Sequence, residues 1–511
     1  MTKRPSSDFD AIVIGAGHNG LITAAYLAKS GLSTLLIEAR SEVGGTAASD
    51  HFAGARVNIC NCDHLTFRTT PVADELSLSS YGLHYLNVEP PQVNIDWSNQ
   101  KPWELWHDID QTVESIAQQF PAAANEYRAY AQAVVPVARL ILEASAQPPS
   151  RRALVATVAK RGGRGMSTLL KMSRMSAADV MRQYFTEEAI IGPAMVEGPV
   201  VWGLSPETPG TGLAATAFAL RHVAHVGRPI GGSGALPEAL KQSFLQSGGL
   251  LRTGTKVVGI VCEGNAVRAV QTSDGASVTA PIVVSACDPK RTFVTWLKNP
   301  PSRAQELVTR WTNADAGEGY ESKIDAVTTT APSILGSQPV SSTIIVSPSL
   351  AELHRGAQLM REGRTMPRMA LLANSPSVAD ATLTSNDDHV FSLEALFTPY
   401  SFTEGWDTKT EPERWLRQFA SLAQPNFMES IVDWRVMTPA DYESKFFLPK
   451  GHATSFAGGP LAAFLGSQPE LTRYHTPIKG LYLTGAATFP GAGVWGASGR
   501  NTALTILKEN S

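Results

Sequence analysis

Three glycines near the start of the chain have the spacing of a nucleotide-binding loop. The apolar run Ala11–Ile14 leads into Gly15-Ala-Gly-His-Asn-Gly20, which has the form G-x-G-x-x-G, and Glu38 ends the next apolar run. In such a loop the first glycine permits a tight turn, the second lets the backbone approach a pyrophosphate, and the third lets a helix pack closely on a strand. A helix N-terminus attracts the phosphates, and the acidic residue accepts ribose hydroxyls. The pattern predicts a bound dinucleotide, with strands at 11–14 and 33–37 and a helix at 21–29.

A second glycine pair favours FAD over NAD as that dinucleotide. Arg40 and the sequence Val43-Gly44-Gly45-Thr46 come soon after Glu38. FAD is the longer molecule, and its pyrophosphate and ribityl chain need a further close approach of the backbone, which adjacent glycines allow. Arg40 would then lie near the phosphates. An ordinary surface turn is the alternative explanation of Gly44 and Gly45.

The C-terminal end of the chain is also suited to close approach to a ligand. A strand expected at 480–485 ends in Gly485, small residues follow at 491–498, and a helix is expected at 500–507. Backbone and a helix N-terminus can therefore approach a planar ligand and stabilise negative charge on it. In the middle of the chain, apolar spacing predicts strands at 252–262, 266–272 and 282–284.

Motifs spread over the whole chain resemble those of phytoene desaturase-type flavoproteins: Gly15–Gly20, Val43–Gly45, Gly231–Leu236, Val284–Pro289 and Gly485–Asn501. Within that family they are most similar to the phytoene dehydrogenase-like branch, also called pyridine nucleotide-disulfide oxidoreductase domain-containing protein 2. The chain has no C-x-x-C pair, only Cys60-x-Cys62, so disulfide chemistry is not expected. The resemblance implies an α/β fold with a discontinuous Rossmann-type FAD-binding domain and an α+β substrate domain, like amine oxidases and phytoene desaturases.

The glycine motifs divide the chain into two predicted domains. The FAD-binding domain is expected from residues 1–75, 230–300 and 450–511. The segments 76–229 and 301–449 lack glycine fingerprints and would form the substrate domain. Within these segments we expect strands at 324–330, 343–346 and 390–397 and a helix at 411–422.

The motifs and the resemblance together imply a set of FAD-binding residues. By similarity, Val257 or Val258 would contact the adenine side, and Ala286 would lie at another strand end near the cofactor. The whole set is Gly15, Gly17, His18, Asn19, Gly20, Glu38, Ala39, Arg40, Gly44, Gly45, Thr46, Val257, Val258, Ala286, Gly485, Ala486, Val494, Trp495, Gly496 and Ala497.

The resemblance implies an FAD-dependent oxidoreductase, a desaturase or dehydrogenase. A substrate C–H bond would give a hydride to flavin N5 and leave a C=C or C=N bond. The expected substrate is a small apolar molecule of an isoprenoid or lipid-like kind. A soluble flavin oxidase of an amine or other polar metabolite, and a non-enzymatic interaction protein that keeps FAD as a structural ligand, are the alternatives. The electron acceptor stays open between oxygen, a quinone and another acceptor.

No side chain is assigned as the catalytic acid or base. The family tends to have His-Pro-Gly-Gly-Gly where this chain has Phe489-Pro-Gly-Ala-Gly493, and a small residue where Trp495 stands, so no relative's substrate can be transferred directly. Four histidines could face a pocket, although a lone histidine is more often structural: His64, His222, His225 and His452.

Composition excludes several classes of protein. The 511 residues are 43% hydrophobic, and 43 Lys+Arg against 46 Asp+Glu give a net charge of −3. This near-neutral balance provides no field to hold nucleic acid. Four cysteines do not make a disulfide framework, and no metal site is expected. No signal-peptide pattern or uninterrupted apolar run of spanning length occurs, so we expect a cytoplasmic protein. Whether it forms a homo-oligomer stays open.

One stretch of the predicted substrate domain is basic. Residues 144–178 contain no acid but hold seven Lys and Arg residues, with Leu, Val and Met interleaved. A basic amphipathic stretch can lie on an anionic membrane surface, which would suit an enzyme that draws a lipid-like substrate from a bilayer. The segment 150–175 is therefore a candidate for peripheral membrane contact, and a solvated helix face is the alternative.

Overall fold

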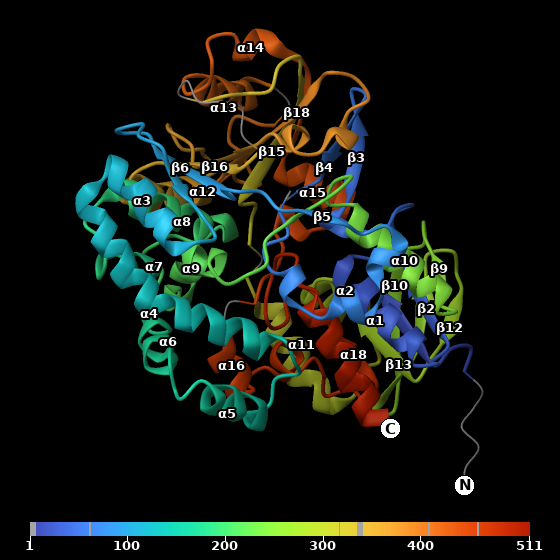
Figure 1. The fold of residues 1–511 in the computed structure, drawn as a ribbon. Helices are drawn as coiled ribbons and strands as arrows, with labels where there is room; N and C mark the ends of the chain where they lie inside the picture. The colour runs from blue at the N-terminus through green and yellow to red at the C-terminus, as the bar shows by residue number, and fades with distance from the viewer. Residues whose placement is uncertain are drawn as a thin grey trace.

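A five-stranded parallel sheet joins both ends of the chain to its middle (Figure 1). This computed structural model describes residues 7–60, 63–315, 317–334, 341–406, 409–456 and 459–510. The strand order is β20–β13–β1–β2–β9, and the neighbouring strands pair in parallel. The strands are β1 (Ala11–Ile14), β2 (Thr34–Ile37), β9 (Leu250–Arg252), β13 (Ile282–Ser285) and β20 (Leu481–Leu483).

Helix α1 (His18–Lys29) begins earlier than the sequence pattern predicted, so His18, Asn19 and Gly20 belong to its first turn. The reason is Gly17, which takes the N-cap position in an extended conformation. The first turn also fastens the two chain ends together. The side chain of Asn19 accepts from the N–H of Gly499 at 3.0 Å, and the hydroxyl of Thr23 donates to the carbonyl of Gly499 at 2.9 Å. Gly499 lies in α18 (Ala497–Asn510).

A second, four-stranded sheet has the order β12–β11–β10–β14. The prediction of one continuous strand over 252–262 was wrong. Arg252 ends β9 in the first sheet, and the chain turns at Gly254, whose φ is +63°. The segment then enters the second sheet as β10 (Val257–Glu263), followed by β11 (Ala266–Thr272), β12 (Ser277–Thr279) and β14 (Leu297–Lys298).

The largest sheet has seven strands in the order β19–β15–β18–β17–β16–β6–β7. It contains the strands expected from the segments that lack glycine fingerprints. In Figure 1 it occupies the upper half of the molecule. The strands are β6 (Gln92–Asp96), β7 (Trp103–Leu105), β15 (Glu321–Thr328), β16 (Thr343–Ser347), β17 (Leu371–Asn374), β18 (His389–Leu396) and β19 (Ile431–Met437).

Helices cover the two faces of this sheet differently. Helix α8 (Glu188–Glu197) lies on one face, where the indole of Trp103 donates to the carbonyl of Ala189 at 3.0 Å. Helix α13 (Thr410–Ala420) lies on the other face, where Phe419 packs on Phe391 of β18 with ring centroids 4.8 Å apart. Because side chains alternate along a strand, Phe391 and Glu394, which stands three residues further along β18, point to opposite faces. The α13 face is therefore apolar, whereas Glu394 points toward the glycine-rich part of the chain.

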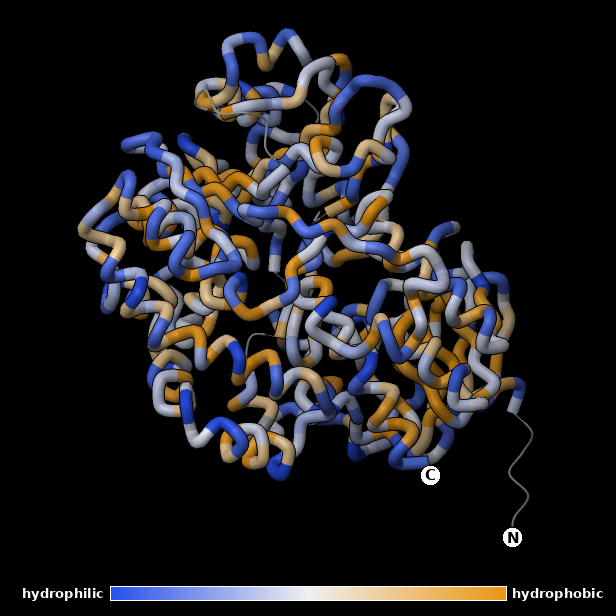
Figure 2. Tube along the Cα trace, in the orientation of Figure 1, coloured by the Kyte–Doolittle hydropathy of each residue, from blue (hydrophilic) through white to orange (hydrophobic). Residues whose placement is uncertain are grey.

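The remaining elements complete the two parts of the molecule. Figure 2 shows apolar residues gathered along the parallel sheet, whereas the outer segment around α5 mixes apolar and hydrophilic residues. Within the described ranges, no helix is both long and apolar enough to cross a bilayer. Two short pairs are β3 (Ser49–Phe52) with β4 (Ala55–Asn58) and β5 (Tyr85–Leu86) with β8 (Arg228–Pro229). The other helices are α2 (Val72–Glu75), α3 (Ile109–Gln119), α4 (Pro121–Ser145), α5 (Arg151–Lys160), α6 (Met166–Met172), α7 (Ala177–Arg182), α9 (Ala217–Arg221), α10 (Ala235–Gln246), α11 (Gln305–Asn313), α12 (Leu350–Arg361), α14 (Phe427–Ser430), α15 (Pro439–Phe446), α16 (Gly459–Leu465) and α17 (Pro469–Thr472).

Candidate functional site

A cavity of about 350 Å³ lies at the carboxyl ends of the parallel strands. Its wall is formed by residues that follow β1, β2, β13 and β20, together with the loop after α15. Ligands of doubly wound folds bind outside the carboxyl ends of the strands, and the volume lies within the range of small-molecule sites. The cavity is therefore the candidate cofactor site.

The structure explains the glycine at each of the three positions of the first loop in a different way. Gly15 has a φ of +95°, which favours glycine. A Cβ on Gly20 would lie 1.9 Å from the carbonyl oxygen of Gly15, so Gly20 is required by the packing of α1 on the loop. A Cβ on Gly17, by contrast, would meet no protein atom within 4 Å, and Gly17 lines the cavity. No protein contact requires glycine at position 17, so the open space beside it is suited to a ligand.

Glu38 stands at the end of β2 and lines the cavity. Its carboxylate already accepts two backbone N–H groups, from Ala16 at 2.7 Å and from Arg40 at 2.9 Å. A carboxylate has about four lone-pair sites, so two remain for ribose hydroxyls. Glu38 thus ties the glycine loop to β2 and keeps acceptor capacity toward the cavity.

The second glycine pair packs directly on the first loop. Gly44 forms a parallel bridge with Gly17, and its N–H donates to the carbonyl of Ala16 at 2.8 Å. Gly44 and Gly45 have φ values of +114° and +56°, and both line the cavity with Thr46. Their left-handed conformations explain the glycine pair. The structure therefore places both glycine motifs along one wall.

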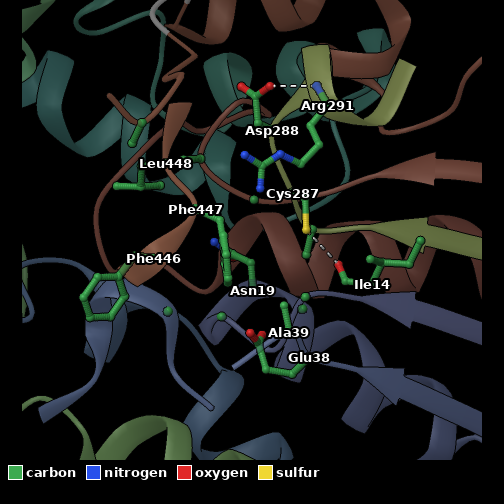
Figure 3. A pocket seen from close by; sticks show the side chains of 18 of the residues that line it. Ile14, Asn19, Glu38, Ala39, Cys287, Asp288, Arg291, Phe446, Phe447 and Leu448 are labelled. Atoms are coloured by element: carbon green, nitrogen blue, oxygen red, sulfur yellow. Dashed lines mark hydrogen bonds between the residues drawn. The ribbon is translucent and has the colours of Figure 1, made fainter. Parts of the chain in front are cut away.

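Three cationic side chains line the cavity: Arg40, Lys256 and Arg291. In the part of the chain that the structure describes, none of them forms a salt bridge with a carboxylate. Arg40 lies over the ring of Phe446 at 4.3 Å, and Lys256 lies over the ring of Phe447 at 5.3 Å. Figure 3 shows Phe446, Phe447 and Leu448 on one side of the cavity and Glu38 and Asn19 on another. The three cations can neutralise an anionic ligand such as a pyrophosphate.

The middle segment contributes Val257, Ala286, Cys287 and Asp288 to the cavity wall. Between the two valines considered from the sequence, Val257 is 7% exposed and lines the cavity, whereas Val258 is 46% exposed. They differ because successive residues of β10 point to opposite faces. Val258 is not among the residues that line the cavity, and a role in cofactor binding is proposed below only for Val257.

The C-terminal segment divides into two parts. Gly485 and Ala486 line the cavity, as do Thr484 and Ala487. The residues Val494, Trp495, Gly496 and Ala497 do not; the indole of Trp495 instead donates to the carbonyl of Ala492 at 3.0 Å. The 494–497 segment borders helix α1 all the same, since a Cβ on Gly496 would lie 3.1 Å from Cδ1 of Ile22.

His18 and Asn19 complete the first turn of α1 in the cavity wall. Burial lowers the pKa of His18 to about 4, so its ring is neutral at physiological pH and adds no positive charge. Its Nε2 lies 2.9 Å from Nδ2 of Asn19. Ala39, next to Glu38, also lines the cavity.

Of the four histidines considered as proton acceptors, His452 lines the cavity. Burial lowers its pKa, which keeps the ring neutral, and its ring lies edge-on to Tyr320 with centroids 5.2 Å apart. His64 is buried between Tyr85 and Ser233, and His222 is hydrogen-bonded to Tyr127. His225 is exposed. The three other rings have structural or solvent-exposed settings.

Sequence reasoning missed the loop after α15, and it also missed two of the cations in the cavity wall, Lys256 and Arg291. Phe446, Phe447, Leu448 and Pro449 line the cavity but lie outside the predicted boundaries of the FAD-binding domain. No sequence motif marks them, because their contribution depends on a left-handed turn at Phe447, whose φ is +59°. Only the folded chain brings this turn over Arg40 and Lys256.

The residues present fit FAD. The open space beside Gly17, the left-handed Gly44 and Gly45, and three cations without carboxylate partners among the described residues provide a cradle for a pyrophosphate. Glu38 offers acceptor capacity for a ribose. Gly485 and Ala486 border the opposite end of the same cavity.

Comparisons with known proteins agree with this geometry. The model of the family described as NAD(P)-binding Rossmann-like domain matches residues 13–75, and that described as flavin containing amine oxidoreductase matches residues 169–311. The chain is 27% identical to pyridine nucleotide-disulfide oxidoreductase domain-containing protein 2 of Mus musculus, over 99% of this chain and 94% of that protein. It is 26% identical to a lycopene-forming phytoene desaturase of Pseudescherichia vulneris, over 98% of this chain and 99% of that protein.

A solved structure has the same fold. Cyclohexylamine oxidase from Brevibacterium oxydans IH-35A superposes with a TM-score of 0.64 at 16% sequence identity, covering 98% of this chain and 99% of that one. The predicted fold class, a Rossmann-type domain with an amine oxidase-like second part, is thereby confirmed.

Proposed function

We propose that this FAD-dependent oxidoreductase, which is similar to flavin-containing amine oxidoreductases and to phytoene desaturases, desaturates or dehydrogenates an apolar, lipid-like substrate. The observation that carries the proposal is the likeness to a phytoene desaturase over almost the whole of both chains. Full-length likeness covers the segments outside the glycine motifs as well, and these would form the substrate domain. We place the FAD-binding part at 1–75, 230–300 and 450–511 and the substrate part at 76–229 and 301–449.

The chain's own residues would bind and orient the reacting groups. FAD, when bound, supplies the acceptor for a hydride from a substrate C–H bond. Glu38 and the first glycine loop would hold the adenosine end, with Val257 against the adenine. Arg40, Lys256 and Arg291 would neutralise the pyrophosphate, and Gly485 and Ala486 would allow close approach at the other end. We keep Val494, Trp495, Gly496 and Ala497 as candidates for the flavin-ring end, because this segment borders α1 at Ile22.

A small apolar groove lies near this end of the site. It lies between α5 and α16 and reaches Phe489. Phe489 packs on Phe456 with ring centroids 5.9 Å apart, and the N–H of Phe456 donates to the carbonyl of Ala486, which lines the cavity. The residues lining the groove include Ala144, Pro149, Leu154, Pro460 and Ala463.

The surface beside the groove has the composition of a membrane-contacting face. Val155 and Leu465 are each 61% exposed, and Arg151 and Arg152 are exposed on the same helix as Val155. Exposed apolar groups flanked by cations suit an anionic lipid surface. We propose that this face contacts a membrane peripherally.

A substrate with a polar or cationic end is the second candidate. The observation that favours it is a pair of buried carboxyl groups, Glu321 and Glu394, on the inner face of the seven-stranded sheet. Negative charge near the cavity wall favours a substrate with a cationic end, whereas a pure hydrocarbon gains nothing from it. This candidate corresponds to a flavin oxidase of an amine or other polar metabolite.

Anaerobic flavin bleaching distinguishes the two candidates. The holoenzyme would be mixed, without oxygen, with phytoene in detergent micelles and separately with a panel of mono- and diamines. Loss of the visible flavin absorbance with phytoene and not with amines supports the first candidate. Bleaching by an amine alone overturns it in favour of the second.

Vesicle binding tests the membrane-facing surface separately. Wild-type protein should co-sediment with vesicles rich in phosphatidylserine, and the double variant Arg151→Glu/Arg152→Glu should not. The matched control is Lys298→Glu/Arg303→Glu, which reverses two exposed cations outside this surface. Equal sedimentation of both double variants would contradict the assignment of the surface, whatever the substrate.

A further inference from the structure

One face of the seven-stranded sheet buries charged side chains. Glu321, Lys323 and Asp325 alternate along β15, and Glu394 of β18 stands directly opposite Lys323. Lys323 and Asp325 are 1% exposed, Glu321 is 5% exposed and Glu394 is 9% exposed. This is the face turned away from α13, and Lys323 Nζ donates to the carbonyl of Asn58 in β4 at 2.8 Å. The charges therefore lie between the sheet and the FAD-binding part.

Lys323 is already paired and does not neutralise both glutamates. It forms a salt bridge with Asp325, which also accepts from Nε of Arg435 at 3.3 Å. Glu321 accepts a hydrogen bond from the thiol of Cys60 at 3.2 Å. Within the described ranges, Glu394 has no hydrogen-bond partner and no salt bridge. A buried ionised carboxylate without a partner is costly, so this arrangement favours a proton on Glu394.

The two carboxyl groups are close enough to act as one titrating unit. Glu321 lies diagonally across from Glu394 in the β15–β18 register, and diagonal neighbours are about 7–8 Å apart. Two like charges at such a distance in a buried setting disfavour double ionisation. We call Glu321 and Glu394 the carboxyl pair.

The electrostatics agree with this geometry. Burial is the main cause that raises the pKa of Glu394 to about 8; the charge of Glu321 raises it further and that of Lys323 opposes the rise. Burial also raises the pKa of Glu321, against the lowering effects of Cys60 and Lys323. The other groups that face the pair are Asp325 on β15, Asp63 in the loop after β4, Tyr320 before β15 and Tyr442 on α15.

A further buried polar atom lies on the same face. Asn374 of β17 pairs in register with Ser392, two residues before Glu394, so its side chain shares the face of the carboxyl pair. Asn374 is 8% exposed, and its Oδ1 has no hydrogen-bond partner among the described residues. A buried acceptor of this kind is usually satisfied by water or a ligand group. It indicates that the pair borders a position that a small polar group can occupy.

Two contacts connect the pair to the cofactor site. Thr66, six positions after Cys60 in the sequence, donates from its hydroxyl to the carbonyl of Val494 at 3.3 Å, in the segment proposed for the flavin-ring end. Tyr320, next to Glu321, packs edge-on against His452 of the cavity wall. Neither glutamate is among the residues that line the cavity, and the pair adjoins the cavity wall through Tyr320.

We propose that the carboxyl pair holds one proton at neutral pH and takes up the proton released during substrate oxidation. FAD, when bound, would be the oxidant and would take one substrate hydrogen with two electrons, as a hydride. The second leaves as a proton, and the electrons of its bond form the new double bond. The ionised member of the pair takes this proton and later returns it to solvent. The inference rests on the oxidoreductase function and holds for either substrate class.

Infrared spectroscopy of the holoenzyme tests the proposal without a substrate. The wild-type protein should show the carbonyl band of a buried protonated carboxylic acid at pH 6, and the band should disappear as the pH rises above about 8. Glu394→Gln should lack the band; the amide is uncharged and of similar shape, so folding should be retained. Glu321→Gln should keep the band but lose it at lower pH, because a neighbouring negative charge has been removed.

The matched control is Glu470→Gln. Glu470 is buried more deeply than the pair, at 1% exposed, but accepts hydrogen bonds from Arg310 at 2.8 Å and Trp311 at 3.2 Å. Its replacement should leave the band unchanged.

Reduction of the flavin with dithionite, without oxygen, should change the band of the wild-type protein and produce no such change in Glu394→Gln. A wild-type protein without the band, a band that survives Glu394→Gln, or a band indifferent to flavin reduction would each overturn the proposal. The last result would leave the oxidoreductase function intact, so the two failures are distinguishable.

Discussion

The pair of variants Gly17→Ala and Gly20→Ala separates cofactor binding from folding within a single loop. Gly17 has a φ of −64° and a ψ of 165°, which alanine adopts readily, and a Cβ there would meet no protein atom within 4 Å. We expect the unfolding free energy of the Gly17→Ala apoprotein to stay within about 0.5 kcal/mol of wild type, as for a substitution without protein contacts. A Cβ on Gly20 would lie 1.9 Å from the carbonyl oxygen of Gly15, so α1 must move. We expect Gly20→Ala to lose about 1–3 kcal/mol.

For FAD affinity the order should be reversed, so that Gly17→Ala has the larger effect. The added methyl group of Gly17→Ala occupies the space proposed for the pyrophosphate, and overpacking of a well-filled site costs about 1–3 kcal/mol. That corresponds to FAD binding weaker by about 5- to 150-fold. Gly17→Val, which adds a branched side chain, should abolish FAD retention.

Two measurements on the same samples test the expected stabilities and the expected FAD affinities. Urea unfolding of the apoproteins gives the unfolding free energy, and titration with FAD, followed by quenching of flavin fluorescence, gives the dissociation constant. Wild-type FAD affinity in Gly17→Ala would refute the position assigned to the pyrophosphate. Unchanged stability in Gly20→Ala would refute the reason given for the third glycine.

Two more outcomes follow from the carboxylates of the site. Glu38→Gln should weaken FAD binding by about 1.5–3 kcal/mol. The single oxygen of the amide cannot accept from the N–H groups of Ala16 and Arg40 and also from a ribose. Equal affinity in an FAD titration would contradict the role of Glu38 in ribose binding. For Glu394, the pKa raised from 4.5 to about 8 means that the folded state binds the proton more tightly than the unfolded state. The unfolding free energy of wild type relative to Glu394→Gln should therefore fall as the pH rises from 4.5 to 8, by at most about 5 kcal/mol, and stay level above pH 8. Urea titrations at several pH values measure this difference. A difference independent of pH would exclude the raised pKa of Glu394.

The glycine motifs could be predicted from the sequence because each glycine has a local cause. Gly15 needs its left-handed φ, Gly44 and Gly45 need theirs, and Gly20 needs the absence of a side chain. Causes of this kind act within a few residues, so they leave a readable spacing. The parallel sheet follows from the same motifs, since a strand, a glycine loop and a helix form one unit.

The loop after α15 could not be predicted, because its position depends on distant segments. Phe446 and Phe447 meet Arg40 and Lys256 only after the chain has folded. The division of this segment into β9 and β10 was not predicted, for a related reason. Apolar residues on both sides of Gly254 predict one strand, whereas the positive φ of that glycine sends the chain into a second sheet.

The carboxyl pair was missed for a different reason, which also explains why it is informative. The sequence Glu321-Ser-Lys-Ile-Asp325 alternates charged residues with others, a pattern typical of a strand with one face in water. In the structure all eight residues of β15 are buried, so the charged face meets the FAD-binding part instead of solvent. Packing alone would favour apolar side chains there, because a buried ion pair is often no more stable than well-packed hydrophobic residues. Lys323 and Asp325 have structural partners on this face, whereas Glu394 has none among the described residues. The proposed role in the reaction supplies a reason for Glu394, and the proton that it holds is the measurable consequence.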